Sequence, residues 1–251
     1  MNYKIYPLNL GTFKEMETSN LMYQTNPGEK IYYPPILGWL ILNDTKAIVV
    51  DTGGSGKEWS IKYHHELERN SEQLIENQLK KRGVNIDEVN TVINTHLHWD
   101  HCFQNESFKN ANFIVQKKEV IAAIDPIPSQ KKYYEIGFKD VQPGWVKVID
   151  RLKVIDGDYQ LNEGIKLLHL PGHTPGLQGV LVQTKKGKYL IAGDAVGVYE
   201  NWDGEKKINH IPQGIHWNLE EYYNSFSKMG MYKAEVLPCH DKRVLGKEYY
   251  G

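Results

Sequence analysis

A tight cluster of histidines and one aspartate constrains this chain more than any other feature. Residues 96–101 read HLHWDH and follow the apolar run 91–95 directly. In an extended backbone, residues two apart project to the same side, so His96 and His98 can reach one metal ion together. The turn that follows can direct Asp100 and His101 toward a second ion. The spacing therefore predicts two metals, because histidines packed this closely have little purpose without a cation.

Three further candidate ligands lie far away in the sequence. His173, Asp194 and His240 each come shortly after an apolar run that is typical of a β-strand. Loop residues at strand ends gather at one edge of a sheet, so we expect these side chains to converge with the cluster. Taken singly, His173 could be an ordinary turn residue and Asp194 a helix cap. Together with residues 96–101 they complete a site for two metals.

The rest of the pattern predicts an α/β protein. Apolar runs at 39–42 and 47–50 indicate a β-hairpin, and Lys186-Gly187 indicates a second hairpin. Ser71 and Asn218 are expected to cap helices through residues 79 and 226. The segment 125–144 holds three prolines and a Tyr133-Tyr134 pair, and we interpret it as a lid or an insertion. The remaining expected elements are a helix over 118–124 and strands over 91–95, 112–116, 166–170, 179–183, 188–192 and 235–237.

Length and composition indicate a single soluble domain over residues 1–251. Apolar residues make up 40% and charged residues 24% of the 251, and the formal net charge is −1. No repeat or Gly/Ser linker marks a boundary. The charge balance gives no reason to expect nucleic acid as a partner, and no apolar run reaches the roughly 18–20 residues of a membrane span.

Cysteine usage and the N-terminus point to the cytoplasm. The chain has two cysteines, Cys102 and Cys239, which are too few for a disulfide framework. We expect both to be small buried side chains beside the ligands. The first residues lack the basic and apolar regions of a secretory signal. A cytoplasmic location is therefore expected.

Residues 96–101 match the HxHxDH signature of the metallo-β-lactamase superfamily, which this chain resembles from about Leu37 to His240. Asp51 and the three distant ligands resemble the other motifs of that superfamily, in the same order. The resemblance implies an αββα sandwich of two mixed β-sheets flanked by helices. It also implies that His96, His98 and His173 bind one metal, that Asp100, His101 and His240 bind the other, and that Asp194 bridges them. Zinc is the expected metal, with manganese, iron or cobalt as alternatives.

Within that superfamily the chain is most similar to the N-acyl-homoserine lactonases. The stretch 168–176, the long segment before the first hairpin and the end soon after His240 carry this similarity. Those lactonases place a tyrosine three residues after the bridging aspartate, where it contacts the substrate carbonyl. Here that position is Gly197, and the nearest tyrosine is Tyr199. Tyr199 is thus a candidate catalytic hydroxyl, and simple packing is the alternative.

These features predict a hydrolase that opens a lactone by attack of a hydroxide shared between the two metals. Asp100 would accept the proton and pass it to the leaving oxygen. Asp51 would orient a ligand histidine, or only order the turn that follows it. The expected partner is a small-molecule ester or lactone, and the resemblance makes a homodimer reasonable.

Several other side chains have two possible roles. His210 and His216 could contact substrate or face solvent. Aromatic residues near the expected mouth could form an apolar wall, or could belong to the core or a subunit interface; they are Trp59, Tyr63, Trp99, Tyr133, Tyr134 and Trp202.

Three other functions compete with the lactonase. A hydrolase of thioesters or other carboxylic esters would share every ligand. A diiron oxidoreductase of this fold typically has glutamate in place of His98 and pairs with a flavin-binding domain. A non-catalytic metal-binding module would be expected to lose ligands, and none is missing here.

Overall fold

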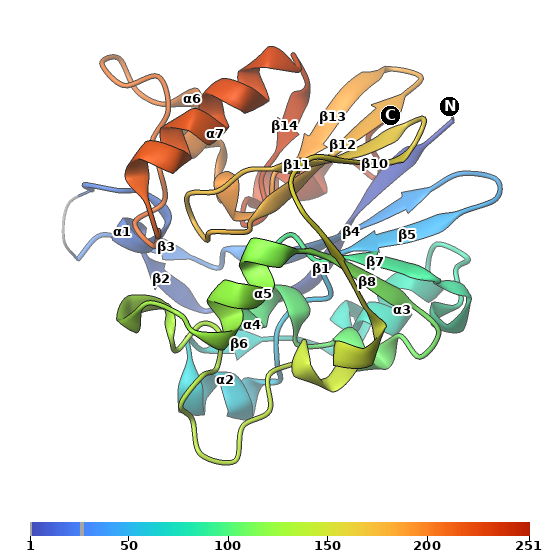
Figure 1. Cartoon of the computed structure of the whole chain (residues 1–251), viewed down its shortest axis with the longest axis horizontal. Helices are drawn as coiled ribbons and strands as arrows, with labels where there is room; N and C mark the ends of the chain where they lie inside the picture. The colour runs from blue at the N-terminus through green and yellow to red at the C-terminus, as the bar shows by residue number, and fades with distance from the viewer. Residues whose placement is uncertain (1, 26–27) are drawn as a thin grey trace.

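Two β-sheets face each other in the computed structural model, which describes residues 2–25 and 28–251 (Figure 1). The first sheet contains, in spatial order, β6 (Leu67–Glu68), β1 (Lys4–Phe13), β4 (Pro35–Leu42), β5 (Ala47–Val50), β7 (Thr91–Ile93), β8 (Asn112–Gln116) and β9 (Leu152–Ile155). The second contains β10 (Tyr159–Asn162), β11 (Ile165–His169), β12 (Gln178–Thr184), β13 (Gly187–Ile191) and β14 (Glu235–Leu237). Parallel and antiparallel pairs occur in both sheets, so both are mixed as predicted.

Alternating side chains of the strands build three apolar layers. Trp39 and Val50 of the first sheet pack with Val180 and Ile191 of the second in a core between the sheets. Their strand neighbours point outward, because successive residues of a strand face opposite sides. Both faces of each sheet are therefore buried, which explains why these strands are continuous apolar runs.

Helices cover the two outer faces, which confirms the αββα sandwich. On one side, α7 (Leu219–Met231) packs Tyr222, Phe226 and Met229 against the second sheet. The spacing of these three residues places them on one face of the helix. On the other side, α3 (Ile75–Lys80) packs Ile75 and Leu79 against the first sheet. Figure 1 shows α7 above the sheets and α2 (Lys57–Tyr63) and α3 below them. The remaining short elements are α1 (Thr18–Leu21), α4 (Trp99–Cys102), α5 (Lys117–Ile124), α6 (Tyr199–Asp203) and the small sheet β2 (Glu15–Glu17) with β3 (Lys30–Tyr32).

Both predicted hairpins and the cap at Asn218 are confirmed. β4 pairs with β5, and β12 pairs with β13, each antiparallel. The Asn218 side chain accepts a hydrogen bond from the backbone N–H of Glu221. The predicted cap at Ser71 is wrong. Asn70 caps a 3₁₀ turn there instead, and the α-helix begins only at Ile75, after Leu74 adopts an extended backbone.

The functional loops leave the sheets at one edge. Asp51 follows β5, the 96–101 cluster follows β7, Asp194 follows β13 and His240 follows β14. β5 and β7 run parallel, as do β13 and β14, so each pair delivers its loops to the same end. Among residues 2–25 and 28–251, none of the helices has the length and apolar character that a membrane span requires.

Candidate metal centre

The seven predicted ligands meet in one buried cluster. Three groups of donor atoms each lie within 4.8 Å of one another: His96, His98 and His173; Asp100, His101 and His240; and His96, His101 and Asp194. None of the seven residues is more than 8% exposed, and Asp100 is the most exposed of them. The structure thus brings together side chains from four distant stretches, in the two groups that the resemblance implied.

Local structure directs residues 96–101 to two sides. β7 ends at Ile93, and the backbone stays irregular through His98. His98 then precedes the first turn of α4, which carries Asp100 and His101. This change from irregular backbone to helix places Asp100 and His101 where they meet His240, while the ring of His101 stays 4.1 Å from that of His96.

Asp194 lies between the two groups. Its Oδ1 atom is 3.1 Å from His101 Nε2 and 3.4 Å from His240 Nε2. Its Oδ2 atom is 3.3 Å from His173 Nε2. Each carboxylate oxygen therefore faces a different histidine group, which is the arrangement of a bridging ligand.

The donor set fits divalent metal ions. The Nε2 atom of His96 is buried and makes no hydrogen bond within the described part of the chain, whereas His101 Nε2 faces the carboxylates of Asp194 and Asp100. Buried polar atoms are ordinarily paired, because an unpaired one costs about 1–3 kcal/mol. Imidazole nitrogens and carboxylate oxygens together suit zinc and other first-row divalent metals. His96 Nε2 has no partner among the described residues, and His98 Nδ1 and His173 Nε2 lie 3.1 Å apart, so these nitrogens indicate a cation as their shared partner.

Hydrogen bonds on the far side of the rings fix most of these orientations. His173 Nδ1 lies 2.7 Å from the Ile215 carbonyl, and His240 Nδ1 lies 2.9 Å from the Pro35 carbonyl. Each ring therefore donates through Nδ1 and directs Nε2 to the cluster, as ligand histidines do.

Asp51 performs both roles that the sequence left open. Its carboxylate lies 2.8 Å from His101 Nδ1 and accepts hydrogen bonds from the backbone N–H and the hydroxyl of Thr95. It thus orients His101 and orders the start of the histidine loop. Asp51 has a φ of 56°, a left-handed conformation that costs most residues energy. The hydrogen bonds of its side chain compensate for that strain.

The two histidine groups differ in their electrostatics. Burial lowers the pKa values of His96, His98 and His173. Burial also opposes protonation of His101 and His240, but nearby carboxylates raise both pKa values.

The pKa values of the two carboxylates are lowered, whereas those of His101 and His240 are raised. Burial disfavours ionised Asp100, yet His101 and His240 lower its pKa to about 2. The three neighbouring histidines likewise hold the pKa of Asp194 well below its usual value against the effect of burial. Both carboxylates are therefore ionised at neutral pH.

Tyr199 lies outside this cluster. Its side chain forms a hydrogen bond with Tyr250 and lies under the guanidinium of Arg243, 5.0 Å from the ring centroid. None of its described contacts joins it to the seven ligands. At the position of the missing tyrosine, a Cβ on Gly197 would lie 2.7 Å from Gln213 Nε2. That amide donates to the Asp194 carbonyl, so Gln213 occupies space that a larger side chain would need.

A second tyrosine lies closer to the ligands. The ring centroid of Tyr133 is 5.3 Å from that of His98, and its hydroxyl has no hydrogen bond to another side chain or carbonyl of residues 2–25 and 28–251. Burial and the charge of Asp100 raise the pKa of Tyr133 to about 12, so the hydroxyl keeps its proton. The adjacent Tyr134 packs on the same histidine, 4.6 Å between centroids. This part of the 125–144 segment therefore covers the three-histidine group, as a lid or insertion would.

The other aromatic and histidine candidates serve mainly in packing. His210 stacks on Trp202, with centroids 4.4 Å apart, and Trp99 stacks on His64 at 4.2 Å. His216 packs its edge on Tyr23. Both cysteines are buried, as expected, and Cys239 Sγ also lies 2.9 Å from Asp194 Oδ1.

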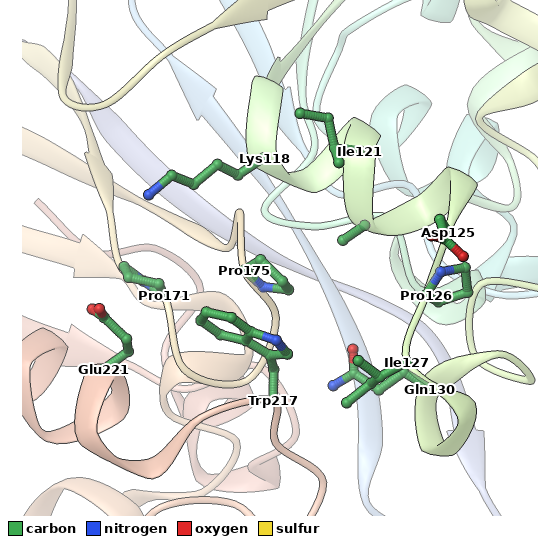
Figure 2. A pocket seen from close by; sticks show the side chains of 11 residues that line it. Lys118, Ile121, Asp125, Pro126, Ile127, Gln130, Pro171, Pro175, Trp217 and Glu221 are labelled. Carbon is green, nitrogen blue, oxygen red and sulfur yellow. The ribbon is translucent and has the colours of Figure 1, made fainter.

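One cavity reaches the cluster, and a second lies beside the loop that carries His173. One of about 500 Å³ reaches His240 and is lined by Met22, Tyr33 and Val198 among others. Another of about 370 Å³ lies between α5 and Trp217, over the loop that carries His173 (Figure 2). Gln130 lines the second cavity and donates a hydrogen bond to the His173 carbonyl. The first cavity directly contacts a predicted ligand, so it is the better candidate for holding substrate.

Comparison with known proteins supports one family. Residues 35–240 match the metallo-beta-lactamase superfamily. An N-acyl homoserine lactonase from a Bacillus species is 31% identical over 202 residues, which cover 76% of this chain and 75% of the relative.

Solved structures agree. A crystal structure of a Bacillus thuringiensis AiiA variant, with N-decanoyl-L-homoserine bound at its active site, has a TM-score of 0.78 and 25% identity, covering 98% of this chain and 96% of the other. A probable metal-dependent hydrolase from Staphylococcus aureus shares the fold, with a TM-score of 0.77 and 18% identity. The match covers 100% of this chain and 96% of the other.

Proposed function

Because the chain belongs to the metallo-β-lactamase superfamily, we propose that it is a metal-dependent hydrolase that opens lactone rings. One observation carries the proposal. Asp194 directs its two carboxylate oxygens at two different groups of buried histidines. The lactonases that the chain resembles make an acyl-homoserine lactone the leading substrate class.

We assign one divalent ion to His96, His98 and His173 and the other to Asp100, His101 and His240. Asp194 would be a ligand shared by both groups, and zinc is the proposed metal. When bound, such ions polarise a carbonyl oxygen and make a water molecule acidic near neutral pH.

Asp100 is the proposed proton carrier. It is ionised, is the most exposed of the seven residues, and its Oδ2 lies 3.5 Å from His101 Nε2. In ring opening, the oxygen of water bonds to the carbonyl carbon and the ring C–O bond breaks. Asp100 accepts the proton that water loses and returns it to the departing ring oxygen, so the product is a hydroxy acid.

A hydrolysis panel tests the substrate class. We expect the metal-loaded protein to show its highest kcat/KM with N-acyl-homoserine lactones, compared with thioesters, simple carboxylic esters, phosphodiesters and β-lactams. Metal content is measured on the same samples. A clear preference for thioesters would favour the main rival. Iron with electron-transfer activity, and no hydrolysis, would favour the diiron alternative.

Two tyrosines compete for the role of hydrogen-bond donor to the substrate carbonyl. If Tyr199 donates this hydrogen bond, Tyr199→Phe lowers turnover without loss of metal. An unchanged kcat in this variant would show that Tyr199 takes no part in the mechanism. The contacts described above favour Tyr133, so we expect Tyr133→Phe to lower kcat on the order of 10²-fold, the effect of losing one donor to an oxyanion. Both variants should keep full metal content.

The two metal groups should respond differently to pH. The pKa values of His96, His98 and His173 are lowered, so these rings are neutral at pH 7 and no proton competes with the metal. The raised pKa values of His101 and His240 mean that protons compete there. We therefore expect the affinity of the second group for metal to rise with pH around neutrality, while that of the first stays nearly constant. Calorimetry of metal binding in buffers of different ionisation enthalpy measures the protons released. Equal proton release from both groups would contradict this.

Three predictions from the sequence remain predictions: a single domain over residues 1–251, a homodimer and a cytoplasmic location. One cooperative unfolding transition would support the first, and sedimentation of the purified protein would decide the second.

A further inference from the structure

A buried glutamate outside the proposed ligands links the loops of the three-histidine group. Glu119 lies in α5 and is 0% exposed. Its neighbour Lys118 lines the cavity on the outward side of the same helix (Figure 2). Burial raises the pKa of Glu119, whereas its hydrogen bonds lower it. No ion pair to a lysine, arginine or histidine forms at Glu119 within residues 2–25 and 28–251.

Four donors from three segments converge on this carboxylate. Oε1 accepts from the backbone N–H of Leu97 at 3.0 Å and from the Tyr134 hydroxyl at 2.8 Å. Oε2 accepts from the Thr174 hydroxyl at 2.7 Å and from the backbone N–H of Gly176 at 3.0 Å. Each oxygen therefore holds one backbone amide and one hydroxyl.

Two of the three segments that donate hydrogen bonds to Glu119 carry the three histidines of this group. Leu97 lies between His96 and His98, and Thr174 follows His173 in the sequence. The Oε1 side therefore fixes the first two ligands, and the Oε2 side fixes the third.

Close packing supports a fixed geometry. A Cβ on Gly176 would lie 2.1 Å from the backbone nitrogen of Glu119, so only glycine allows this approach. The loop after β11 is thus pressed against α5, where the carboxylate can reach it.

The chemistry requires a carboxylate at this position. Two backbone N–H groups face opposite oxygens, and neither N–H can turn into an acceptor. A glutamine presents one amide NH₂ group, which would face one of those N–H groups and leave it unpaired in a buried site.

We infer that Glu119 is a positioning residue that sets the geometry and the metal affinity of the group formed by His96, His98 and His173. Among the hydrogen bonds of residues 2–25 and 28–251, none joins Glu119 to Asp100, His101 or His240. The inference rests on the proposed function only in that the cluster binds metal.

Metal titration of Glu119→Gln tests this inference. We expect one of the two zinc equivalents to bind about 10–100-fold more weakly, as when a supporting group of a ligand is lost. The other equivalent should keep its wild-type affinity. In the metal-free variant, the amide proton that faces the introduced NH₂ group, that of Leu97 or of Gly176, should exchange faster with solvent, which reports the lost hydrogen bond independently of metal and of catalysis.

Glu135→Gln is the matched control. Glu135 is also a buried glutamate, but its carboxylate contacts Trp59 and His64 of the α2 region rather than a ligand loop. Its variant should bind both zinc equivalents as the wild type does.

Several results would overturn the inference. Wild-type affinity for both equivalents in Glu119→Gln would do so, as would equal weakening of both. If Glu119→Gln does not fold, Thr174→Val removes a single hydrogen-bond donor to Glu119 instead. This variant should bind one zinc equivalent more weakly than the wild type, by a smaller factor. Unchanged zinc affinity in Thr174→Val would also overturn the inference. A wild-type protein that binds no zinc would instead refute the proposed function.

Discussion

Asp194→Ala is expected to lower kcat/KM for lactone hydrolysis on the order of 10³-fold, at the upper end of what a single electrostatic group contributes. The reason is geometric. Asp194 is the side chain that faces both histidine groups, so its loss removes a ligand from each proposed metal at once. Metal content should fall below two equivalents in the same samples. Steady-state kinetics with metal analysis on each preparation measures both effects.

Asp158→Ala provides the control for that experiment. Asp158 is a partly exposed aspartate that pairs with Lys228 and Lys166, away from the cluster. Its variant should keep the wild-type rate and metal content. Wild-type activity with two bound metals in Asp194→Ala would remove the bridging role and, with it, the central argument for the function.

Removal of the metals is expected to lower the melting temperature by roughly 8–16 °C. A ligand present at about 1,000 times its Kd stabilises the native state by about 4 kcal/mol, and each kcal/mol shifts Tm by about 2–4 °C in a domain of this approximate size. Without the ions, the buried His96 Nε2 lacks a partner, and His98 Nδ1 and His173 Nε2 face each other at 3.1 Å. Two buried carboxylates, Asp100 and Asp194, also lose the cations that would neutralise them.

Thermal unfolding monitored by circular dichroism tests this expectation. The protein is measured as loaded, after dialysis against a chelator, and after zinc is added back. Recovery of the original Tm on re-addition shows that the change is reversible. Identical melting curves in all three states would mean that no metal is bound in the native protein.

The sequence by itself determined the structural features that depend on residues close together along the chain. The spacing of His96, His98, Asp100 and His101 predicted two directions of approach, and the turn from irregular backbone into α4 produces them. Eight strands are predicted, and seven of them lie within two residues of the observed bounds, because strands buried on both faces read as continuous apolar segments. No strand is predicted for β1, β2, β3, β6, β9 or β10. The hairpin from β4 to β5 follows from the same rule.

The local sequence pattern did not predict elements whose residues are untypical of them. β1 is the longest strand of the first sheet, but Pro7 and Gly11 interrupt its pattern and its register with β4 shifts between Asn9 and Thr12. Proline and glycine inside a run argue against a strand, so no strand is predicted over residues 4–13. At the helix near residue 71, Asn70 and Ser71 are both good caps, and only the folded backbone distinguishes them.

Only the tertiary structure decided which distant side chains meet. Glu119 is an ordinary charged residue in a short helical pattern, yet it accepts hydrogen bonds from Leu97 and Gly176. Tyr199 is near Asp194 in the sequence, but its hydroxyl is engaged by Tyr250, whereas Tyr133 lies against His98. The physical reason is that spacing along a strand or helix sets the direction of a side chain, while its partners depend on how separate elements pack.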